Sequence, residues 1–184
     1  MNANGFAIQL YFDRQTENRI RAFRESLYQT GIQPVLGKKN DRPHVTLAVL
    51  GMEDAQRLIR IGEEFSRTLR QFRVELVASG VFPTSDNVIY LTPVPSLRLI
   101  DTHHEFHRIL SKEGLIPSHY YLPDRWVPHC TLETEQTDEQ FEKMVLRCKR
   151  SFTSIDGFFS SLGVISFWPI DYLAEFPLIS QDKK

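Results

Sequence analysis

One pattern, Pro-His-x-Thr-Leu, occurs twice in this chain of 184 residues. It reads Pro-His-Val-Thr-Leu at 43–47 and Pro-His-Cys-Thr-Leu at 128–132, so that 85 residues separate His44 from His129. With only 10 prolines and 6 histidines in the chain, chance composition gives roughly 0.002 copies of the pattern. An offset of about half the chain is typical of an internal duplication. The repeat therefore predicts a fold made of two similar halves.

Each copy of the pattern lies in a segment that predicts a β-strand, over 44–51 and 126–133. Side chains alternate along a strand, so the histidine and threonine of each copy share one face. The first copy places His44 beside Thr46, and the second places His129 beside Thr131. The opposite, buried face receives the intervening residues: Val45, Leu47, Val49, Cys130 and Leu132. If the halves pack about a pseudo-twofold axis, two imidazoles and two hydroxyls line one groove.

Strands and helices follow each other twice in a similar order along the chain. Apolar runs predict further strands over 5–12, 73–82 and 88–94, and two or three within 152–179. Helical spacing of apolar residues predicts helices over 14–29, 53–71, 96–113 and 137–150. The strand pairs around 73–94 and 152–179 resemble hairpins. These elements predict an α+β fold with one or two antiparallel sheets and helices packed outside.

The charge balance excludes one class of function. Lysine and arginine number 22 against 23 acidic residues, which gives a net charge of −1 and rules out a strongly basic surface that coats nucleic acid. A local basic groove stays possible.

No apolar run is long enough to span a membrane, and no signal peptide is visible. The two cysteines form no disulfide framework. We expect a soluble, cytoplasmic protein.

The paired histidines and threonines suit chemistry at a phosphoester. Histidine exchanges protons near neutral pH, so one neutral imidazole can act as a base while the other, charged, acts as an acid. The two threonine hydroxyls can hydrogen-bond the non-bridging phosphate oxygens. Acid, base and anion binding are then all supplied by side chains, so we expect no metal and no cofactor.

The paired motifs resemble those of the 2H phosphoesterase superfamily, specifically its bacterial 2′-5′ RNA ligase and cyclic phosphodiesterase group. Weaker similarity extends to 80–83, 88–91 and 120–132. The resemblance implies a single bilobal domain over 1–184, with two pseudo-symmetric lobes, each an antiparallel sheet with outer helices, around a central cleft. It also implies that His44 and His129 are catalytic, and that Thr46 and Thr131 bind the phosphate of a 2′,3′-cyclic or 2′-linked substrate.

Residues on segments near the motifs are candidates for binding the rest of such a substrate. Arg42 and Arg125 precede the two motifs, as do Lys38 and Lys39, and could contact RNA phosphates. Phe82 and Tyr121 could stack on a base. An ordinary solvated loop and core packing are the respective alternatives.

Two other features allow different chemistry. His103 and His107 share a helix face and could hold a metal, although no further ligand is apparent and a solvated helix face is the expected environment. Cys130 neighbours a histidine, but alternation places the two on opposite faces, so we expect a small buried side chain rather than a nucleophile.

We therefore expect hydrolysis of a 2′,3′-cyclic phosphate or a 2′-5′ bond, with a nucleotide or an RNA terminus as substrate and no obligate protein partner. Ligation of RNA ends by the reverse reaction is one alternative. A non-catalytic module that binds nucleotides or RNA ends is another, and a metal-binding protein is a third.

Overall fold

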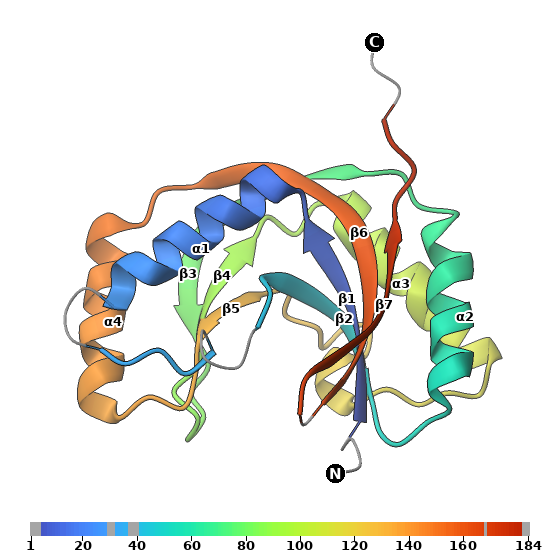
Figure 1. The fold of residues 1–184 in the computed structure, drawn as a ribbon, viewed down its shortest axis with the longest axis horizontal. Helices are drawn as coiled ribbons and strands as arrows, with labels where there is room; N and C mark the ends of the chain where they lie inside the picture. Colours follow the sequence, from blue (N-terminus) through green and yellow to red (C-terminus); the bar gives the residue numbers. More distant parts are fainter. Residues whose placement is uncertain (1–4, 29–31, 37–40, 168, 182–184) are drawn as a thin grey trace.

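The computed structural model describes residues 5–28, 32–36, 41–167 and 169–181. Its strands and helices follow the predicted order (Figure 1). The strands are β1 (Gly5–Phe12), β2 (His44–Leu50), β3 (Phe72–Val81), β4 (Ile89–Pro93), β5 (Cys130–Glu133), β6 (Ile155–Phe167) and β7 (Asp171–Pro177). The helices are α1 (Arg14–Tyr28), α2 (Ala55–Ser66), α3 (Leu97–Lys112) and α4 (Asp138–Ser151), with a 3₁₀ turn η2 (His119–Tyr121). None of the helices in the described ranges is both long and apolar enough to cross a membrane.

The order β-α-β-α-β occurs twice along the chain. The first copy is β1-α1-β2-α2-β3, and the second is β4-α3-β5-α4-β6, with β7 added at its end. Each motif falls at or just before the second strand of its copy, since His44 begins β2 and His129 immediately precedes β5. The duplication read from the motifs thus extends to the elements around them.

All the strands belong to one sheet. Its order is β2-β1-β6-β3-β4-β5, and β7 pairs with β6. The paired strands run antiparallel, as expected. The first part of β6 pairs with β3, and its remainder pairs with β1 and β7. The predicted lobes are therefore joined by one long strand, instead of each having a sheet of its own.

The β6 strand passes from one lobe to the other at Phe159. This residue pairs with Phe12 of β1 and with Phe72 of β3. Its ring lies 5.0 Å from that of Phe12 and 5.2 Å from that of Phe72, measured between centroids. A buried aromatic cluster thus marks the junction of the lobes.

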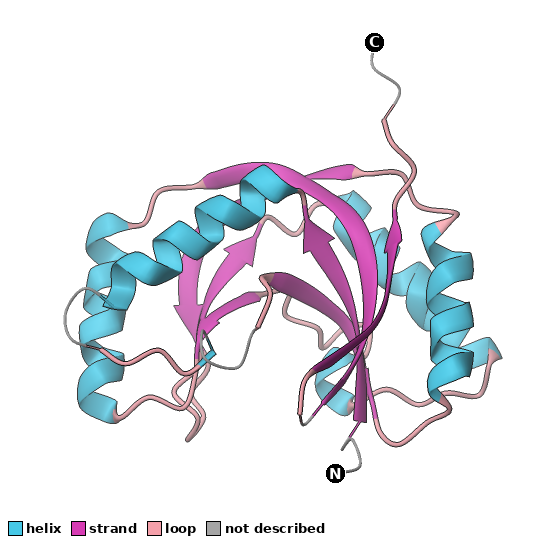
Figure 2. Ribbon diagram, in the orientation of Figure 1, coloured by secondary structure: helices cyan, strands magenta, loops and turns pink. Residues whose placement is uncertain are grey.

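The helices cover the outer faces of the curved sheet (Figures 1 and 2). In these views α1 and α4 lie beside β3, β4 and β5, whereas α2 and α3 lie beside β1, β2, β6 and β7. The lobe with β4 and β5 therefore takes α1 and β3 from the first half of the chain, and the other lobe takes α3, β7 and the second part of β6 from the second half. This arrangement confirms the α+β fold class, with antiparallel strands and outer helices.

Local sequence signals set several of the helix ends. Asp54, Ser96 and Thr137 cap the first turns of α2, α3 and α4 through their side-chain oxygens. Gly114 follows α3 with a φ of 68°, the left-handed conformation that glycine adopts most easily. The expected helix over 53–71 ends early, at Ser66. Leu69 continues the helical spacing of apolar residues and is buried, but the chain reaches it through a turn rather than through further helix.

Candidate active site

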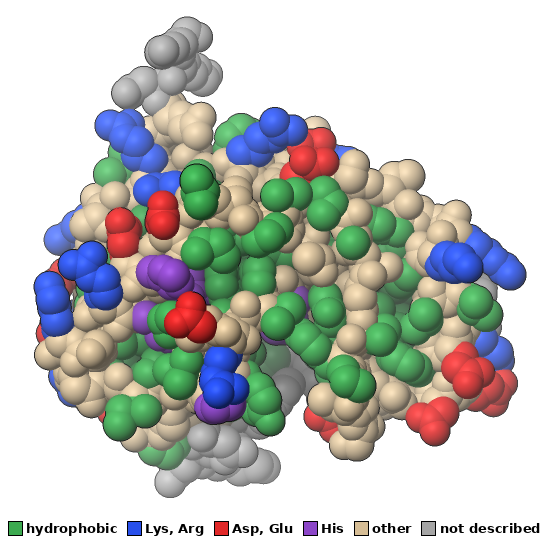
Figure 3. Space-filling model, turned by 180° about the vertical axis from the view of Figure 1, so that it is seen from behind, with side chains coloured by type: hydrophobic (Ala, Val, Ile, Leu, Met, Phe, Trp, Pro, Cys, Tyr) green, Lys and Arg blue, Asp and Glu red, His purple; other side chains and the backbone are tan. Residues whose placement is uncertain are grey.

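The two motif strands meet in the middle of the molecule. β2 and β5 are the outer strands of the sheet order, yet the curved sheet brings them into contact. The His44 backbone N–H hydrogen-bonds the sulfur of Cys130 in the other motif. His44 and His129 line a single cavity of about 370 Å³, a size found for small-molecule sites. Seen from behind, the molecule is indented between the lobes (Figure 3).

The two imidazole rings are held in the same way. Nδ1 of His44 lies 2.6 Å from the Arg42 carbonyl oxygen, and Nδ1 of His129 lies 2.7 Å from the Val127 carbonyl oxygen. A carbonyl oxygen can only accept, so Nδ1 carries the proton in each ring. Nε2 is then the nitrogen of each ring that can gain or lose a proton.

Each motif strand has a β-bulge directly after its threonine. The register of β2 against β1 shifts at Leu47, and that of β5 against β4 shifts at Leu132. A bulge re-aims the side chains that follow it. Val49 and Thr134, 85 residues apart, accordingly both line the cavity. The expectation that Val49 lies on the buried face opposite His44 is wrong, because strict alternation stops at the bulge.

The two motif threonines differ in their surroundings. Thr131 lines the cavity. Thr46 is buried, and its hydroxyl hydrogen-bonds the hydroxyl of Tyr121, which itself lines the cavity. Burial raises the pKa of Tyr121, so this hydroxyl stays protonated at neutral pH. The cavity wall thus has one threonine hydroxyl and one tyrosine hydroxyl supported by the other threonine.

Aromatic rings surround His129. The Phe82 ring, which also lines the cavity, lies edge-on to the imidazole at 4.9 Å and 85°, and the Tyr90 ring lies at 5.5 Å. Burial, together with the nearby His44, lowers the pKa of His129, although the Val127 carbonyl opposes this shift. His129 is therefore neutral at neutral pH.

The sequence as a whole matches a known family. The model of the 2′-5′ RNA ligase superfamily matches residues 12–166, which is most of the chain. The chain belongs to the 2′-5′ RNA ligase superfamily. A sequence comparison with curated proteins found no match.

Solved structures similar to this superfamily member share its fold over almost the full length. A phosphoesterase is 16% identical, with a TM-score of 0.66, and the alignment covers 97% of this chain and 99% of the other. E. coli LigT, solved with 3′-AMP, is 16% identical with a TM-score of 0.64 over 96% and 99% of the two chains. TT0787 of Thermus thermophilus is 15% identical, also with a TM-score of 0.64 over 96% and 99%.

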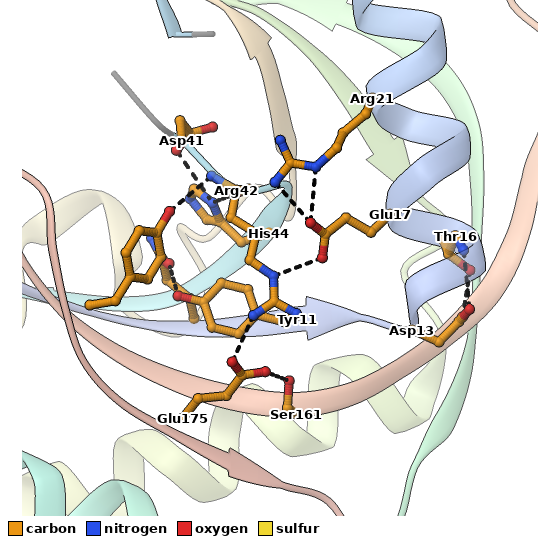
Figure 4. Close-up of polar contacts among 12 residues, drawn as sticks. Tyr11, Asp13, Thr16, Glu17, Arg21, Asp41, Arg42, His44, Ser161 and Glu175 are labelled. Carbon is orange, nitrogen blue, oxygen red and sulfur yellow. Dashed lines mark hydrogen bonds and ion pairs between the residues drawn. The ribbon is translucent and has the colours of Figure 1, made fainter. Parts of the chain in front are cut away.

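The structure does not bring Arg42 to the cavity. Its guanidinium donates to Glu17 at 2.7 Å and to Glu175 at 2.8 Å, and lies 4.1 Å from the centre of the Tyr11 ring (Figure 4). These two carboxylates neutralise the positive charge of Arg42, which the sequence analysis offered as a contact for a substrate phosphate. What Arg42 offers the site of this superfamily member is its carbonyl oxygen, which holds the ring of His44.

The other basic candidates lie elsewhere. Arg125 is exposed and is not among the residues that line the cavity, so its contact with substrate stays a prediction. Lys38 and Lys39 lie outside the described residues. Of the four residues suggested by the resemblance to this superfamily, the cavity therefore gathers His44, His129 and Thr131, and of the other candidates it gathers Phe82 and Tyr121.

Two histidines of α3 have a structural role. His103 Nε2 lies 2.9 Å from the Tyr121 carbonyl oxygen, and His107 Nε2 lies 3.1 Å from that of Leu47. The His103 ring also stacks on Trp126, at 4.0 Å and 4°. The expected solvated helix face is wrong for both, because they are buried against the edge of a motif strand. Within the described ranges, no three His, Cys, Asp or Glu side chains are grouped so as to hold a metal ion.

The structure supports the packing interpretation of Cys130. Its side chain is fully buried, and burial raises the pKa of its thiol to about 12. The thiol is therefore protonated at neutral pH, which makes it a poor nucleophile.

Sequence reasoning missed a buried ion pair between the motifs. Asp41 lines the cavity, and its Oδ1 lies 3.8 Å from Nδ1 of His44. Its Oδ2 pairs with Arg24 of α1 at 3.2 Å. Asp41 comes three residues before a motif histidine, which was a signal in the sequence. Arg24 offered none, because it lies in an ordinary amphipathic helix.

A second buried carboxylate, Glu133, holds the wall of the cavity. It accepts hydrogen bonds from the Tyr28 hydroxyl at 2.6 Å and from the backbone N–H groups of Val35 at 3.0 Å and Leu36 at 2.8 Å. The backbone N–H of Thr134 adds a fourth, at 3.0 Å. Because Leu36 and Thr134 line the cavity, Glu133 fixes two parts of its wall.

Proposed function

We propose that this protein hydrolyses a phosphodiester with a 2′ linkage, either a 2′,3′-cyclic phosphate or a 2′-5′ bond of a nucleotide or RNA end. The proposal rests on one observation: two imidazoles, each fixed through Nδ1 to a carbonyl oxygen, line the same cavity. Membership of the superfamily supports phosphoester chemistry. LigT, which shares the fold, has been solved with 3′-AMP, and this supports a nucleotide as the ligand class.

The reaction needs one proton removed and one supplied. Nε2 of the neutral imidazole takes a proton from water as the water oxygen bonds to phosphorus. Nε2–H of the charged imidazole donates a proton to the 2′ or 3′ oxygen as its bond to phosphorus breaks. The hydroxyls of Thr131 and Tyr121 can hydrogen-bond the non-bridging oxygens, where charge develops in the transition state. Because the side chains perform each step, the proposed reaction needs no metal.

Aromatic residues at the cavity suit the base of a nucleotide. Phe82 and Tyr121 both line it, together with apolar residues such as Ile165 and Phe167. A base that stacks on one of these rings would place the ribose phosphate between the histidines.

The reverse reaction uses the same groups. A 5′-hydroxyl in place of water would attack the cyclic phosphate and form a 2′-5′ bond. The name of the superfamily favours this as the second candidate. No nucleoside triphosphate is needed, because a phosphorus–oxygen bond of the cyclic phosphate breaks as the new bond to the 5′ oxygen forms.

The decisive experiment is a substrate panel. It contains 2′,3′-cyclic nucleotides and 2′-5′ dinucleotides, with 3′-5′ dinucleotides as the specificity control, and the products are resolved as 2′- or 3′-phosphates. We expect cleavage of at least one of the first two classes, unaffected by EDTA. No turnover of either class, or activity only with added divalent metal, would contradict the proposal.

Variants test the histidine pair. His44→Ala and His129→Ala should each lower kcat/KM by about 10²–10⁴-fold, the usual range for a positioned acid or base. His104→Ala, an exposed histidine outside the cavity, is the matched control and should keep wild-type activity. Near wild-type activity of either motif variant would rule out the mechanism.

A further inference from the structure

The strand β1 places a buried amide in the wall of the cavity. Every residue of this strand is buried, and apart from Gln9 and Tyr11 its side chains are apolar. Alternation puts Ala7, Gln9 and Tyr11 on one face of the strand. Gln9 is 3% exposed and lines the same cavity as His44 and His129. Burying an amide costs free energy unless both of its ends find partners, so each end of Gln9 calls for one.

The oxygen end of the amide has its partner. The Tyr11 hydroxyl donates to Gln9 Oε1 at 2.8 Å. Burial raises the pKa of Tyr11, so the hydroxyl keeps its proton at neutral pH. The reverse orientation of the amide would leave this proton without an acceptor among the described residues. Tyr11 therefore fixes which way the amide of Gln9 faces.

The ring of Tyr11 is itself held on both sides. The Arg42 guanidinium lies 4.1 Å from the centre of this ring (Figure 4). Gly163 of β6, the partner of Gln9 in the sheet, leaves the space that the ring fills, because a Cβ at this position would clash with it. Tyr11 is thus a rigid support for the amide before any substrate binds.

The nitrogen end of the amide has no partner in the protein. Gln9 Nε2 donates no hydrogen bond within the described ranges. It is also not among the fully buried side-chain atoms that lack a partner, so it is accessible. Because Gln9 lines the cavity, its two N–H groups can be reached from there. A nearly buried donor of this kind needs a partner from outside the chain.

Gln9 lies where the sequence led us to expect a threonine hydroxyl. It is directly opposite Thr46 in the register of β1 against β2, so the two side chains share one side of the sheet. The Thr46 hydroxyl is bonded to that of Tyr121, and Thr46 is not among the residues that line the cavity. At the second motif, Thr131 does line it. The wall beside the first motif thus presents an amide where the wall beside the second presents a hydroxyl.

The chemistry of the free end suits a phosphate oxygen. The non-bridging oxygens of a phosphodiester only accept hydrogen bonds, and an amide N–H₂ only donates. A donor that is oriented in advance stabilises charge on such an oxygen without reorganising during the reaction. Side-chain amides are among the groups that perform this role in enzymes.

We propose that Gln9, oriented by Tyr11, is a further catalytic residue whose Nε2 donates to a non-bridging oxygen of the phosphate held between the two motif histidines. This inference rests on the proposed function, and it adds a third donor to the hydroxyls of Thr131 and Tyr121. The hydrogen bond strengthens as negative charge develops on the oxygen, and no proton is transferred to or from Gln9.

The first test removes the donor. Gln9→Met keeps the length of the side chain, and it should lower kcat/KM for the substrate that the panel identifies by about 10–100-fold, mainly through kcat. Gln9→Glu should lose more, because a carboxylate repels the phosphate. Gln56→Glu, which adds the same charge at an exposed position of α2, is the matched control and should keep wild-type activity. Activity within 2-fold of wild type in folded Gln9→Met would overturn the inference.

The second test separates a contact with phosphate from a structural role. Two phosphorothioate isomers of the substrate each replace one non-bridging oxygen by sulfur, which is a poor acceptor. In Gln9→Met the rate ratio of oxygen to sulfur should fall by about 10-fold for one isomer and stay the same for the other. Tyr11→Phe should lower the same ratio, because the amide loses its fixed orientation. A purely structural role would slow all three substrates equally, so unchanged ratios for both isomers would refute the contact.

A third readout uses the wild-type protein, so it depends neither on the folding of a variant nor on turnover. NMR follows the side-chain N–H₂ signals of Gln9 while inorganic phosphate is added. A shift of these signals, with about 10-fold weaker phosphate binding in Gln9→Met, supports the role of Gln9 even if no substrate is cleaved, in which case the proposed function alone fails. Unshifted signals refute the role of Gln9 even if the enzyme is active.

Discussion

Acid should destabilise this fold through His103 of α3. Its ring is buried between Trp126 and the Tyr121 carbonyl oxygen. Burial is the largest cause of a pKa lowered from 6.5 to about 3, and the neighbouring His107 adds to it. The unfolded chain binds a proton at this ring below pH 6.5, while the folded chain does not. Stability is therefore complete above pH 6.5 and is lost as the pH falls from there toward 3.

The size of the effect follows from the two pKa values. For each proton that the unfolded chain binds and the folded chain does not, the free energy of unfolding changes by about 1.4 kcal/mol per pH unit. Between pH 7 and pH 5 the ring in the unfolded chain goes from about one-quarter protonated to almost fully protonated, and the free energy of unfolding should drop by up to about 2 kcal/mol. At these pH values the result depends on the unfolded pKa, since the folded value of about 3 lies far below them.

Urea unfolding at pH 7 and pH 5 measures this loss. His103→Gln keeps a donor for the Tyr121 carbonyl oxygen but cannot titrate, so its stability should fall less between the two pH values, by up to about 2 kcal/mol. His104→Gln, at the exposed neighbouring position, should behave like wild type. If His103→Gln shows the same pH dependence as wild type, the ring does not remain neutral in the folded state and the reasoning fails.

Two further substitutions test the packing around the site. Glu133→Gln places an amide N–H₂ among the four donors that the carboxylate satisfies, and should lower the free energy of urea unfolding by about 2 kcal/mol; unchanged stability would mean that these hydrogen bonds are not formed. Gly163→Ala would bring a Cβ within 2.1 Å of the Tyr11 ring, and should destabilise by about 1–3 kcal/mol. Gly51→Ala, which meets no atom within 4 Å, is its control, and equal effects of the two would contradict the contact.

The sequence alone predicted what depends on local pattern. Strand alternation placed His129 and Thr131 on one face, and both line the cavity. It placed Thr46 beside His44 in the same way, but Thr46 is buried and is not among the residues that line the cavity. Strand alternation placed Val49 on the buried face, but Val49 lines the cavity because a bulge at Leu47 interrupts the alternation. Such a bulge depends on the partner strand as well as on the strand itself. The end of α3 was predicted from Gly114, whose conformation is a local property.

What depends on distant parts of the chain was not predictable. The pairing of one strand with both lobes joins segments that no local pattern links. His103 and His107 are buried because α3 packs near β2, some 60 residues away in the sequence. The helical spacing of residues within α3 therefore could not show that these two histidines are buried rather than exposed. The same holds for Arg24, whose partner Asp41 lies beyond the end of its helix.

The exchange of elements between the halves has a consequence for how the chain can be divided. A fragment cut between β4 and α3 would hold β1 and β2, but not the strand β6 that lies beside β1. It would likewise hold β3 without Phe159, the ring that packs against Phe72. Each fragment would expose apolar surface that only the complementary fragment can cover. The two pieces are thus obligate folding partners, and cutting the chain would convert an intramolecular fold into a heterodimer with its active site at the subunit interface.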